Sequence, residues 1–347
     1  MSLWLSVFVA PLFDWTWNTD RKDFYHHHKG LSMRMRIVAG VVLAGLVSGF
    51  LFAQTKLKIA VIPKGTTHVF WKSVEAGARA AGKELGVEII WKGPLKENDR
   101  AQQIAIVEQF VQEGVSGIVL APLDNTALQR PVAAAVGKKI PVVIFDSALK
   151  GEPGKDFVSF VSTDNKKGGM LGGEHLSKLL NGKGKIVLLR YQVGSASTME
   201  REEGFVEALA RNPRLKLTVN NRYAGATAGE AKTAAMNIID KLKEADGVFA
   251  PNESSTFGML LALRQSNLAG KIKFVGFDTS PPLIEALQKG EIDALVAQDP
   301  TRMGYEGVKT LIASIQGKQV PRTVDTGVRL ITRENMDTPE IKKLLGN

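Results

Sequence analysis

Short apolar runs rich in β-branched residues alternate with longer amphipathic segments from residue 59 to residue 277. This alternation is typical of a parallel sheet covered by helices on both faces, because strands buried on both faces are apolar along their whole length. The expected strands are 59–62, 87–91, 117–121, 141–145, 157–162, 185–190, 215–220, 247–250 and 272–277, and the expected helices are 70–85, 100–113, 128–136, 198–210, 229–243 and 255–265. The pattern predicts an α/β protein with doubly wound parallel sheets.

The second half of this pattern repeats the first half. One expected strand ends in alanine and is followed by Pro122, and another ends in alanine and is followed by Pro251, 129 residues later (251 − 122 = 129). One expected strand ends in phenylalanine and is followed by Asp146, and another ends in phenylalanine and is followed by Asp278, 132 residues later (278 − 146 = 132). Two similar lobes explain motifs that recur at a nearly constant spacing. A pocket between such lobes would take its polar groups from the strand ends of both halves.

Composition excludes several other classes of protein. At 347 residues, of which 44% are hydrophobic, the chain can bury a core in each of two lobes. It contains no cysteine, which excludes disulfides, thiolate metal sites and a lipid-anchored amino-terminal cysteine. The net charge of +10 comes from scattered basic residues without an arginine- and lysine-rich stripe, so we expect no nucleic-acid partner.

The amino-terminal region has the features of an export signal. Arg34 and Arg36 precede an uncharged apolar run, 37–53, which ends in Leu-Phe-Ala. A basic segment, an apolar segment and a small residue at the cleavage point describe a secretory signal peptide, and a single membrane anchor is the alternative. We therefore expect residues 1–53 to be a leader and signal peptide that is cleaved after Ala53.

Candidate binding residues follow the first strand. A Pro-Lys-Gly turn contains Lys64, and His68, Phe70 and Trp71 come just after it. Loops at the carboxyl ends of parallel strands line the crevice where ligands bind, so these side chains could form a pocket wall. The alternative is a basic surface turn followed by two aromatic residues of the core.

Polar residues also follow later strands of both halves. These candidate ligand-binding residues are Asp146, Ser147, Asn252, Asp278 and Gln298. Each one alone could cap a helix or a turn, and for Asp124 a helix N-cap is the interpretation that we favour. Considered together, they predict a polar ring between the lobes.

This constellation favours binding over catalysis. Residues 54–347 hold only His68 and His175, and they show no nucleophile elbow, zinc-protease motif or phosphate-binding loop, so we expect no enzyme activity, cofactor or metal. Carboxylates, amides and arginine instead offer paired hydrogen bonds to neighbouring hydroxyls, and aromatic faces pack against the C–H faces of a sugar ring. The residues are suited to binding a polyol.

In the order of these motifs, the chain resembles the ribose-binding type of periplasmic sugar-binding protein, a type I periplasmic binding protein of ABC importers. Phe70 and Trp71 match its stacking aromatics, and the matching polar residues are Asp146, Arg201, Asn252, Asp278 and Gln298. The resemblance implies lobes 54–163 plus 299–327 and 164–298 plus 328–347, with a three-segment hinge near Thr163, Gln298 and Gly327. It also implies a periplasmic location, a small sugar-like ligand, a membrane permease as partner and, as a further option, a chemoreceptor.

The sequence alone leaves the identity of the ligand open. Lys64 and Ser147 depart from the ribose-binding pattern and are more similar to the autoinducer-2 receptor branch, although that branch's Asp-Gln pair would fall at Met199 and Glu200. Lys64 could contact a neutral sugar, pair with an acidic sugar, or pair with Asp146. A sugar-sensing regulator domain shares the fold, but it would need a DNA-binding domain where the signal sequence stands.

Overall fold

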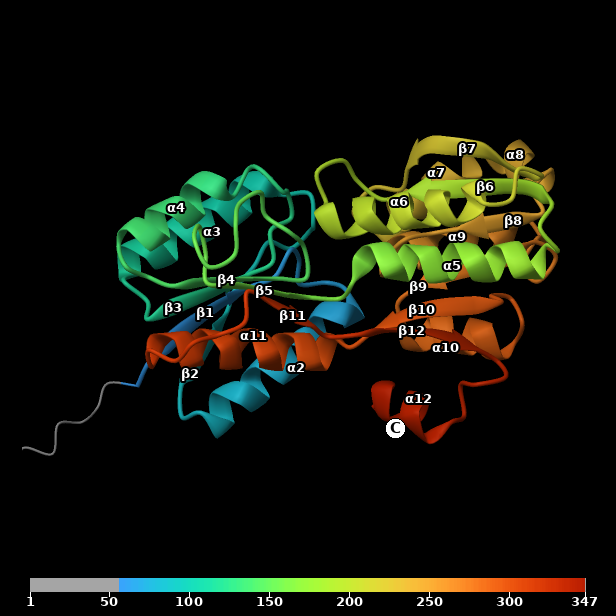
Figure 1. The fold of residues 1–347 in the computed structure, drawn as a ribbon. Helices are drawn as coiled ribbons and strands as arrows, with labels where there is room; N and C mark the ends of the chain where they lie inside the picture. The colour runs from blue at the N-terminus through green and yellow to red at the C-terminus, as the bar shows by residue number, and fades with distance from the viewer. Residues whose placement is uncertain (1–55, 347) are drawn as a thin grey trace, which may run out of the picture. The chain divides into compact units, whose positions relative to one another are not determined.

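Residues 56–346 are described by the computed structural model, and the predicted signal peptide lies outside them. They form two α/β lobes, each built on a sheet of six strands (Figure 1). The prediction of two doubly wound lobes is confirmed. Among these residues, no helix is long and apolar enough to cross a bilayer.

The first sheet is parallel throughout, with the strand order β11-β5-β4-β3-β1-β2. Its strands are β1 (Lys58–Ile62), β2 (Glu88–Trp91), β3 (Gly117–Leu120), β4 (Val142–Phe145), β5 (Ser159–Ser162) and β11 (Thr323–Asp325). Its helices are α2 (Val69–Glu84), α3 (Arg100–Glu113), α4 (Gln129–Gly137) and α11 (Pro300–Ile315). The central strand β1 shows the two-residue alternation: Ile59 and Val61 pack towards α2 and α11, and Ala60 and Ile62 pack towards α3 and α4.

The second sheet has the order β12-β10-β9-β8-β6-β7 and is parallel except for β12, which runs antiparallel to β10. Its strands are β6 (Gly184–Arg190), β7 (Leu215–Tyr223), β8 (Gly247–Phe249), β9 (Lys273–Phe277), β10 (Ala294–Gln298) and β12 (Val328–Thr332). Its helices are α5 (Asn165–Leu179), α6 (Ala196–Ala210), α7 (Ala228–Met236), α8 (Ile239–Lys243), α9 (Glu253–Gln265), α10 (Pro281–Gln288) and α12 (Pro339–Leu344). In β6, Ile186 and Leu188 pack on the α5 and α6 side, and Val187 and Leu189 pack on the α7 and α9 side.

The chain passes between the two sheets three times. The connections lie between β5 and α5, between β10 and α11, and between β11 and β12. They contain Thr163, Asp299 and Gly327, which is the three-segment connection expected from the sequence. The residue bounds of the two lobes stay a prediction.

Helices α5 and α6 approach each other so closely that side chains are excluded at two positions. A Cβ atom on Gly169 would collide with the backbone of Arg201, and a Cβ atom on Gly204 would collide with the backbone of Lys166. Because an alanine at either position would push these backbones apart, the two glycines fix the distance of α6 from α5. The position of the Arg201 side chain depends on that distance.

One expected helix is interrupted. The sequence predicts a single helix over 229–243, but the chain leaves helical geometry between α7 and α8, where Ile238 has φ −118° and ψ 23°. Asn237 precedes the break, and asparagine side chains compete for backbone hydrogen bonds and so disfavour helix interiors. Ile238 and Leu242 are both buried in the same core cluster, so the break keeps the apolar face in place.

Candidate functional site

A small cavity lies where the carboxyl ends of strands from both sheets meet. Its volume is about 20 Å³. It is lined by Lys64, His68, Phe70, Trp71, Glu97, Asp146, Ser197, Thr198, Arg201, Asn252, Glu253, Asp278 and Gln298. Every candidate residue from the sequence except Ser147 is in this wall. We call this wall the cleft site.

Asp146 and Asp278 occupy equivalent positions, directly after β4 and β9. Both have a left-handed backbone, with φ of 60° and 72°, which aspartate tolerates better than most residues other than glycine. The N–H of Asp146 donates to the carbonyl of Val161 in β5 at 3.0 Å, and that of Asp278 donates to the carbonyl of Val296 in β10 at 2.8 Å. The same turn therefore brings a carboxylate into the cleft site from each lobe.

Lys64 is a buried lysine that links the two lobes. Its side chain is only 4% exposed, and its Nζ lies 3.0 Å from Oδ2 of Asp146. The ammonium also donates to Oγ of Ser197 at 2.9 Å and to Oγ of Ser195 at 3.4 Å, both near the start of α6 in the second lobe. A buried charge needs a counter-charge and further hydrogen bonds to be tolerated. Of the three interpretations open for Lys64, the structure shows the pairing with Asp146.

Ser147 is buried but does not line the cavity. Its Oγ accepts a hydrogen bond from the backbone N–H of Ser197 at 3.0 Å. This N–H is in the first turn of α6, where backbone donors have no partner within the helix. Ser147 therefore joins the first lobe to the helix that carries Arg201, and its contact with a ligand stays a prediction.

Glu97 is the centre of a second buried network. Its Oε1 accepts the indole N–H of Trp71 at 2.7 Å and lies 2.7 Å from Nδ1 of His68. Its Oε2 accepts the hydroxyl of Tyr191 at 2.8 Å. Because Glu97 follows β2 and Tyr191 follows β6, this carboxylate also connects the two lobes.

The charges in this network reinforce one another. Burial alone would lower the pKa of His68, but the carboxylate of Glu97 raises it to about 9. Burial alone would raise the pKa of Glu97, but the charge of His68, together with Lys64 and the Trp71 hydrogen bond, lowers it to about 2. At neutral pH the pair is an imidazolium beside a carboxylate. The pKa of Tyr191 is raised by burial and by Glu97, so its hydroxyl stays protonated.

Glu253 connects the second lobe to the helix that carries the two aromatic residues. Its carboxylate accepts the N–H of Val69 at 3.2 Å and the N–H of Phe70 at 2.9 Å, the first two residues of α2. The N-terminus of a helix favours a negative charge, and its first N–H groups have no partner within the helix. The carboxylate of Glu253 supplies both the charge and the hydrogen-bond acceptor. Burial raises the pKa of Glu253, and the backbone donors oppose this rise.

Arg201 is held in one orientation by contacts on every side. Its side chain donates to Oδ1 of Asn165 at 2.8 Å, to the carbonyl of Pro251 at 3.0 Å and to Oε1 of Gln298 at 2.8 Å. Its Cζ lies 3.9 Å from the ring centroid of Phe277, so the guanidinium also packs on an aromatic face. The guanidinium is therefore preorganised beside the cavity.

Gln298 extends this network to Asp278. Its amide donates to Oδ1 of Asp278 at 2.7 Å, and the N–H of Glu253 donates to Oδ2 at 2.7 Å. Burial raises the pKa of Asp278, and the charge of Arg201 and these hydrogen bonds oppose the rise. Asn252 caps α9, since its Oδ1 accepts the N–H of Ser255, and it lines the cavity as well.

The aromatic residues form a wall that continues into the core. Phe70 and Trp71 meet edge to face with ring centroids 4.9 Å apart, and Trp71 meets Phe145 in the same way at 6.1 Å. Trp71 is only 2% exposed and belongs to the core cluster of the first sheet. Both interpretations of Trp71, core residue and pocket wall, therefore describe its position.

Asp124 has a local role, but it does not cap a helix. Its Oδ1 accepts the N–H groups of Thr126 and Ala127 at 2.9 Å, and its Oδ2 lies 2.9 Å from Nε of Arg100. It does not line the cleft site. The prediction of a helix N-cap is wrong, because the N-cap of α4 is Leu128, and Asp124 instead closes the turn that precedes this helix.

Comparison with known proteins places this chain in a family. A family model described as periplasmic binding protein domain matches residues 59–319. The chain belongs to the periplasmic binding protein family. It is 28% identical over 303 residues to the ribose import binding protein of Salmonella typhimurium, covering 86% of this chain and 97% of that relative. It is 30% identical over 314 residues to the D-ribose/D-allose-binding protein of Pseudomonas aeruginosa, with coverage of 86% and 97%.

A solved structure agrees with this assignment. The carbohydrate transporter solute binding protein of Agrobacterium radiobacter, determined in complex with D-arabinose, has a TM-score of 0.80 and 34% sequence identity. The match covers 84% of this chain and 99% of that protein. The resemblance to the ribose-binding type is therefore confirmed, and this periplasmic binding protein is not an enzyme. Within residues 56–346, no three acidic or histidine side chains are grouped to hold a metal ion.

Four residues in the wall of the cleft site are absent from the sequence-based candidates. They are Glu97, Ser197, Thr198 and Glu253. Ser197 and Thr198 are on the same helix as Arg201, and Glu253 follows Asn252 directly, so nearness to a candidate was a usable signal. Glu97 follows no predicted motif, and nothing in its local sequence marks it.

Proposed function

We propose that this periplasmic binding protein is the receptor of an ABC importer and binds a neutral monosaccharide or a related small polyol between its two lobes. The relatives support the ligand class, since their names refer to ribose, to ribose and allose, and to a complex with arabinose. All of these are neutral monosaccharides. Delivery of the sugar to a membrane permease is part of the same proposal, and the name of the Salmonella relative, an import binding protein, supports it.

The observation that carries this proposal is the convergence of planar polar groups from both lobes on one buried cavity. Carboxylates come from Asp146 and Asp278, a guanidinium from Arg201, and amides from Asn252 and Gln298. Such groups form paired hydrogen bonds with neighbouring hydroxyls, and leaving buried hydroxyls unpaired would cost about 1–3 kcal/mol each. The aromatic residues Phe70 and Trp71 supply the face on which a sugar ring can pack.

The balance of charge in the cleft site favours a neutral ligand over an acidic one. The basic residues in its wall are Lys64, His68 and Arg201, and the acidic residues are Glu97, Asp146, Glu253 and Asp278. Lys64 and His68 already have counter-charges at 3.0 Å and 2.7 Å. An acidic sugar would bring a further negative charge into a site where carboxylates outnumber cations. No contact in this wall favours the autoinducer-2-type, acidic-sugar or regulator alternatives.

A monosaccharide enters the cleft site only after its walls separate. The volume of about 20 Å³ is close to the space that one water molecule requires. Lys64, Glu97 and Glu253 hold the lobes together through contacts with Ser197, Tyr191 and Phe70, respectively. We infer that a hinge motion about the three connections opens this site. The two lobes that move would be residues 54–163 plus 299–327 and residues 164–298 plus 328–347.

Export belongs to the same proposal. Residues 1–53 would act as a leader and signal peptide, and cleavage after Ala53 would release the mature protein into the periplasm. Amino-terminal sequencing of the exported protein tests this, because an amino terminus other than Gln54 would contradict the cleavage point. Engagement of a chemoreceptor by the sugar-bound protein is a further step that pull-down with and without sugar would test.

A thermal-denaturation screen tests the ligand class. The purified protein is heated with D-ribose, D-allose, D-arabinose, sugar acids, sugar phosphates and autoinducer-2. A ligand present at roughly 1,000 times its dissociation constant adds about 4 kcal/mol, a shift on the order of 10 °C for a chain of this size. A large shift with a neutral sugar supports the proposal. A shift confined to acidic compounds would contradict it in favour of the acidic-sugar alternative.

A further inference from the structure

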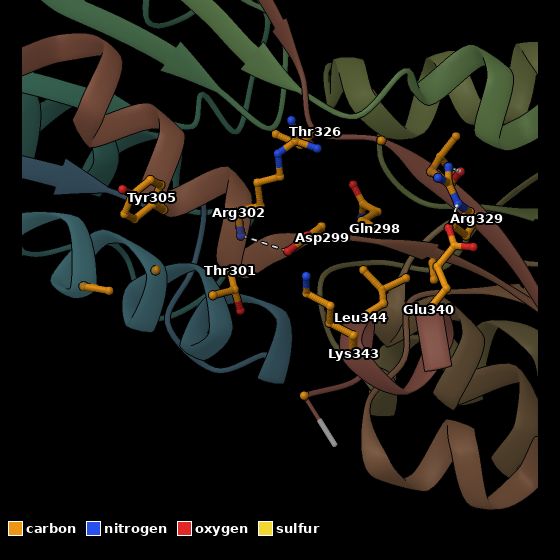
Figure 2. A pocket seen from close by; sticks show the side chains of 16 residues that line it. Gln298, Asp299, Thr301, Arg302, Tyr305, Thr326, Arg329, Glu340, Lys343 and Leu344 are labelled. Carbon is orange, nitrogen blue, oxygen red and sulfur yellow. Dashed lines mark hydrogen bonds and ion pairs between the residues drawn. The ribbon is translucent and has the colours of Figure 1, made fainter. Parts of the chain in front are cut away.

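A second and larger cavity lies beside the segments that connect the two lobes (Figure 2). Its volume is about 550 Å³, which is within the range of small-molecule sites. Helices α2 and α11 of the first lobe line it together with β12 and α12 of the second lobe. We call it the hinge cavity. Gln298 lines both the hinge cavity and the cleft site, but the proposed function gives the hinge cavity no role.

Much of the wall of the hinge cavity is apolar. Ala80, Ala297, Val328, Leu344 and the ring of Tyr305 all line it. Such a surface gains free energy when an apolar group displaces water from it. A ligand of this cavity should therefore have an apolar body.

Two basic side chains at the hinge cavity form no ion pair. Arg302 in α11 and Lys343 in α12 line it, and within residues 56–346 neither has an acidic oxygen within 4.0 Å. The carboxylate of Asp299 also lines it and accepts the backbone N–H of Arg302 as the cap of α11. Arg329, which also lines it, is already paired with Glu340 at 2.8 Å. In Figure 2, the Arg302 side chain extends towards Thr326 and the Lys343 side chain extends towards the middle of the cavity. The hinge cavity therefore offers two cations to a ligand.

We propose that the hinge cavity binds a small organic anion, with an apolar body and one carboxylate, sulfonate or phosphate group. Arg302 and Lys343 hold the anionic group, and the apolar wall covers the body. Because α11 belongs to the first lobe and α12 to the second, such a ligand contacts both lobes at once. This proposal does not depend on which sugar the cleft site binds.

A pair of matched fluorescent probes tests the proposal. The anionic probe is 8-anilinonaphthalene-1-sulfonate, and N-phenyl-1-naphthylamine is the same ring system without the sulfonate. Each is titrated into the purified protein and into the double variant Arg302→Gln, Lys343→Gln. We expect the anionic probe to bind the double variant about tenfold more weakly or worse, because two charge-assisted contacts are lost. The neutral probe should bind both proteins alike, which also shows that the variant is folded.

A second double variant controls for the general charge of the surface. Lys216→Gln with Arg222→Gln removes two exposed basic side chains of β7, away from the hinge cavity. We expect this control to bind the anionic probe as tightly as the unmodified protein does. Equal weakening in both double variants, or unchanged affinity in Arg302→Gln, Lys343→Gln, would overturn the proposal.

Discussion

The strand ends of the two lobes share a backbone conformation but have different partners. Asp146 and Asp278 both follow phenylalanine, have positive φ and donate their N–H to the next strand of their sheet. Asp146 meets the ammonium of Lys64 at 3.0 Å, whereas Asp278 meets the amide of Gln298 and the N–H of Glu253, each at 2.7 Å. The comparison shows that local sequence places each carboxylate at the cleft, while a distant segment decides how its charge is balanced.

The acidic residues after β3 and β8 differ in the same way. Asp124 and Glu253 are related by the repeat spacing of the two lobes (253 − 124 = 129). Asp124 accepts the N–H of Ala127 in its own loop at 2.9 Å, whereas Glu253 accepts the N–H of Phe70 in the other lobe at 2.9 Å. An acidic residue at one position of the repeat therefore closes a local turn in one lobe and connects the lobes in the other.

The largest expected difference between the lobes is in stability. Asp146→Asn removes the counter-charge of Lys64 but keeps the left-handed turn, because asparagine also tolerates positive φ. We expect the free energy of unfolding to fall by about 3–5 kcal/mol, since Lys64 stays buried without its partner. Guanidinium denaturation at pH 7 measures this loss.

Asp278→Asn is the matched variant in the other lobe. Burial raises the pKa of Asp278, so folding does not stabilise its ionised form, and no ion pair within 4.0 Å holds it in the described residues. We expect a loss below about 2 kcal/mol, from weakened hydrogen bonds alone. If both variants lost the same free energy of unfolding, the ion pair of Asp146 would stabilise the protein no more than the hydrogen bonds of Asp278 do.

Sugar binding should depend on Asp278 and not on the acidic residue outside the cleft site. Asp278→Ala is expected to weaken binding by at least about 100-fold without unfolding the protein, because a buried charged hydrogen-bonding group is lost. Asp124→Ala is the control, and its affinity should be unchanged. Isothermal titration with the sugar found in the screen measures both, and an unchanged affinity in Asp278→Ala would remove this residue from the site.

The buried pair of the first lobe predicts a window of pH for stability. The pKa of His68 is raised from 6.5 to about 9, so its contribution is complete below pH 6.5 and is lost as the pH rises through about 9. The pKa of Glu97 is lowered from 4.5 to about 2, so its contribution is present above pH 4.5 and is lost as the pH falls through about 2. Both contributions are complete between pH 4.5 and 6.5.

Replacing His68 tests that window. In His68→Gln, we expect the loss of stability between pH 6 and pH 9 to be smaller than in the unmodified protein by about 2–3 kcal/mol. His175→Gln is the control, because the pKa of His175 is lowered by burial and it loses no stabilising charge in this range. Denaturation curves across this range measure the difference, and superimposable curves for the unmodified protein and His68→Gln would contradict it.

The smallest expected effect concerns the acidic residues that follow β3 and β8. Glu253→Gln should destabilise the contact between the lobes by about 1 kcal/mol, because α2 loses a negative charge at its N-terminus. Asp124→Asn should cost about as much but act within the first lobe, on its own turn and on Arg100 of α3. Amide hydrogen exchange separates the two, since only Glu253→Gln should speed exchange at Val69 and Phe70.

Much of the cleft site could be predicted because strand ends are recognisable in the sequence. Asp146, Asp278 and Gln298 each end an apolar run, and the ends of parallel strands gather at one edge of a sheet. Glu97 ends no such run, and it enters the site only because Trp71 and Tyr191 meet it in space. No local pattern could identify it.

The sequence by itself determined the elements and their pairing into two similar lobes, because the two-residue period of buried strands and the spacing of the repeat are local properties of the chain. Only the tertiary structure decided which groups the side chains of the cleft site form hydrogen bonds with. Ser197 lies 133 positions from Lys64, and Glu253 lies 184 positions from Val69, so these bonds exist only when the two lobes meet. These hydrogen bonds depend on where whole helices lie in the folded protein, and no local sequence pattern determines that.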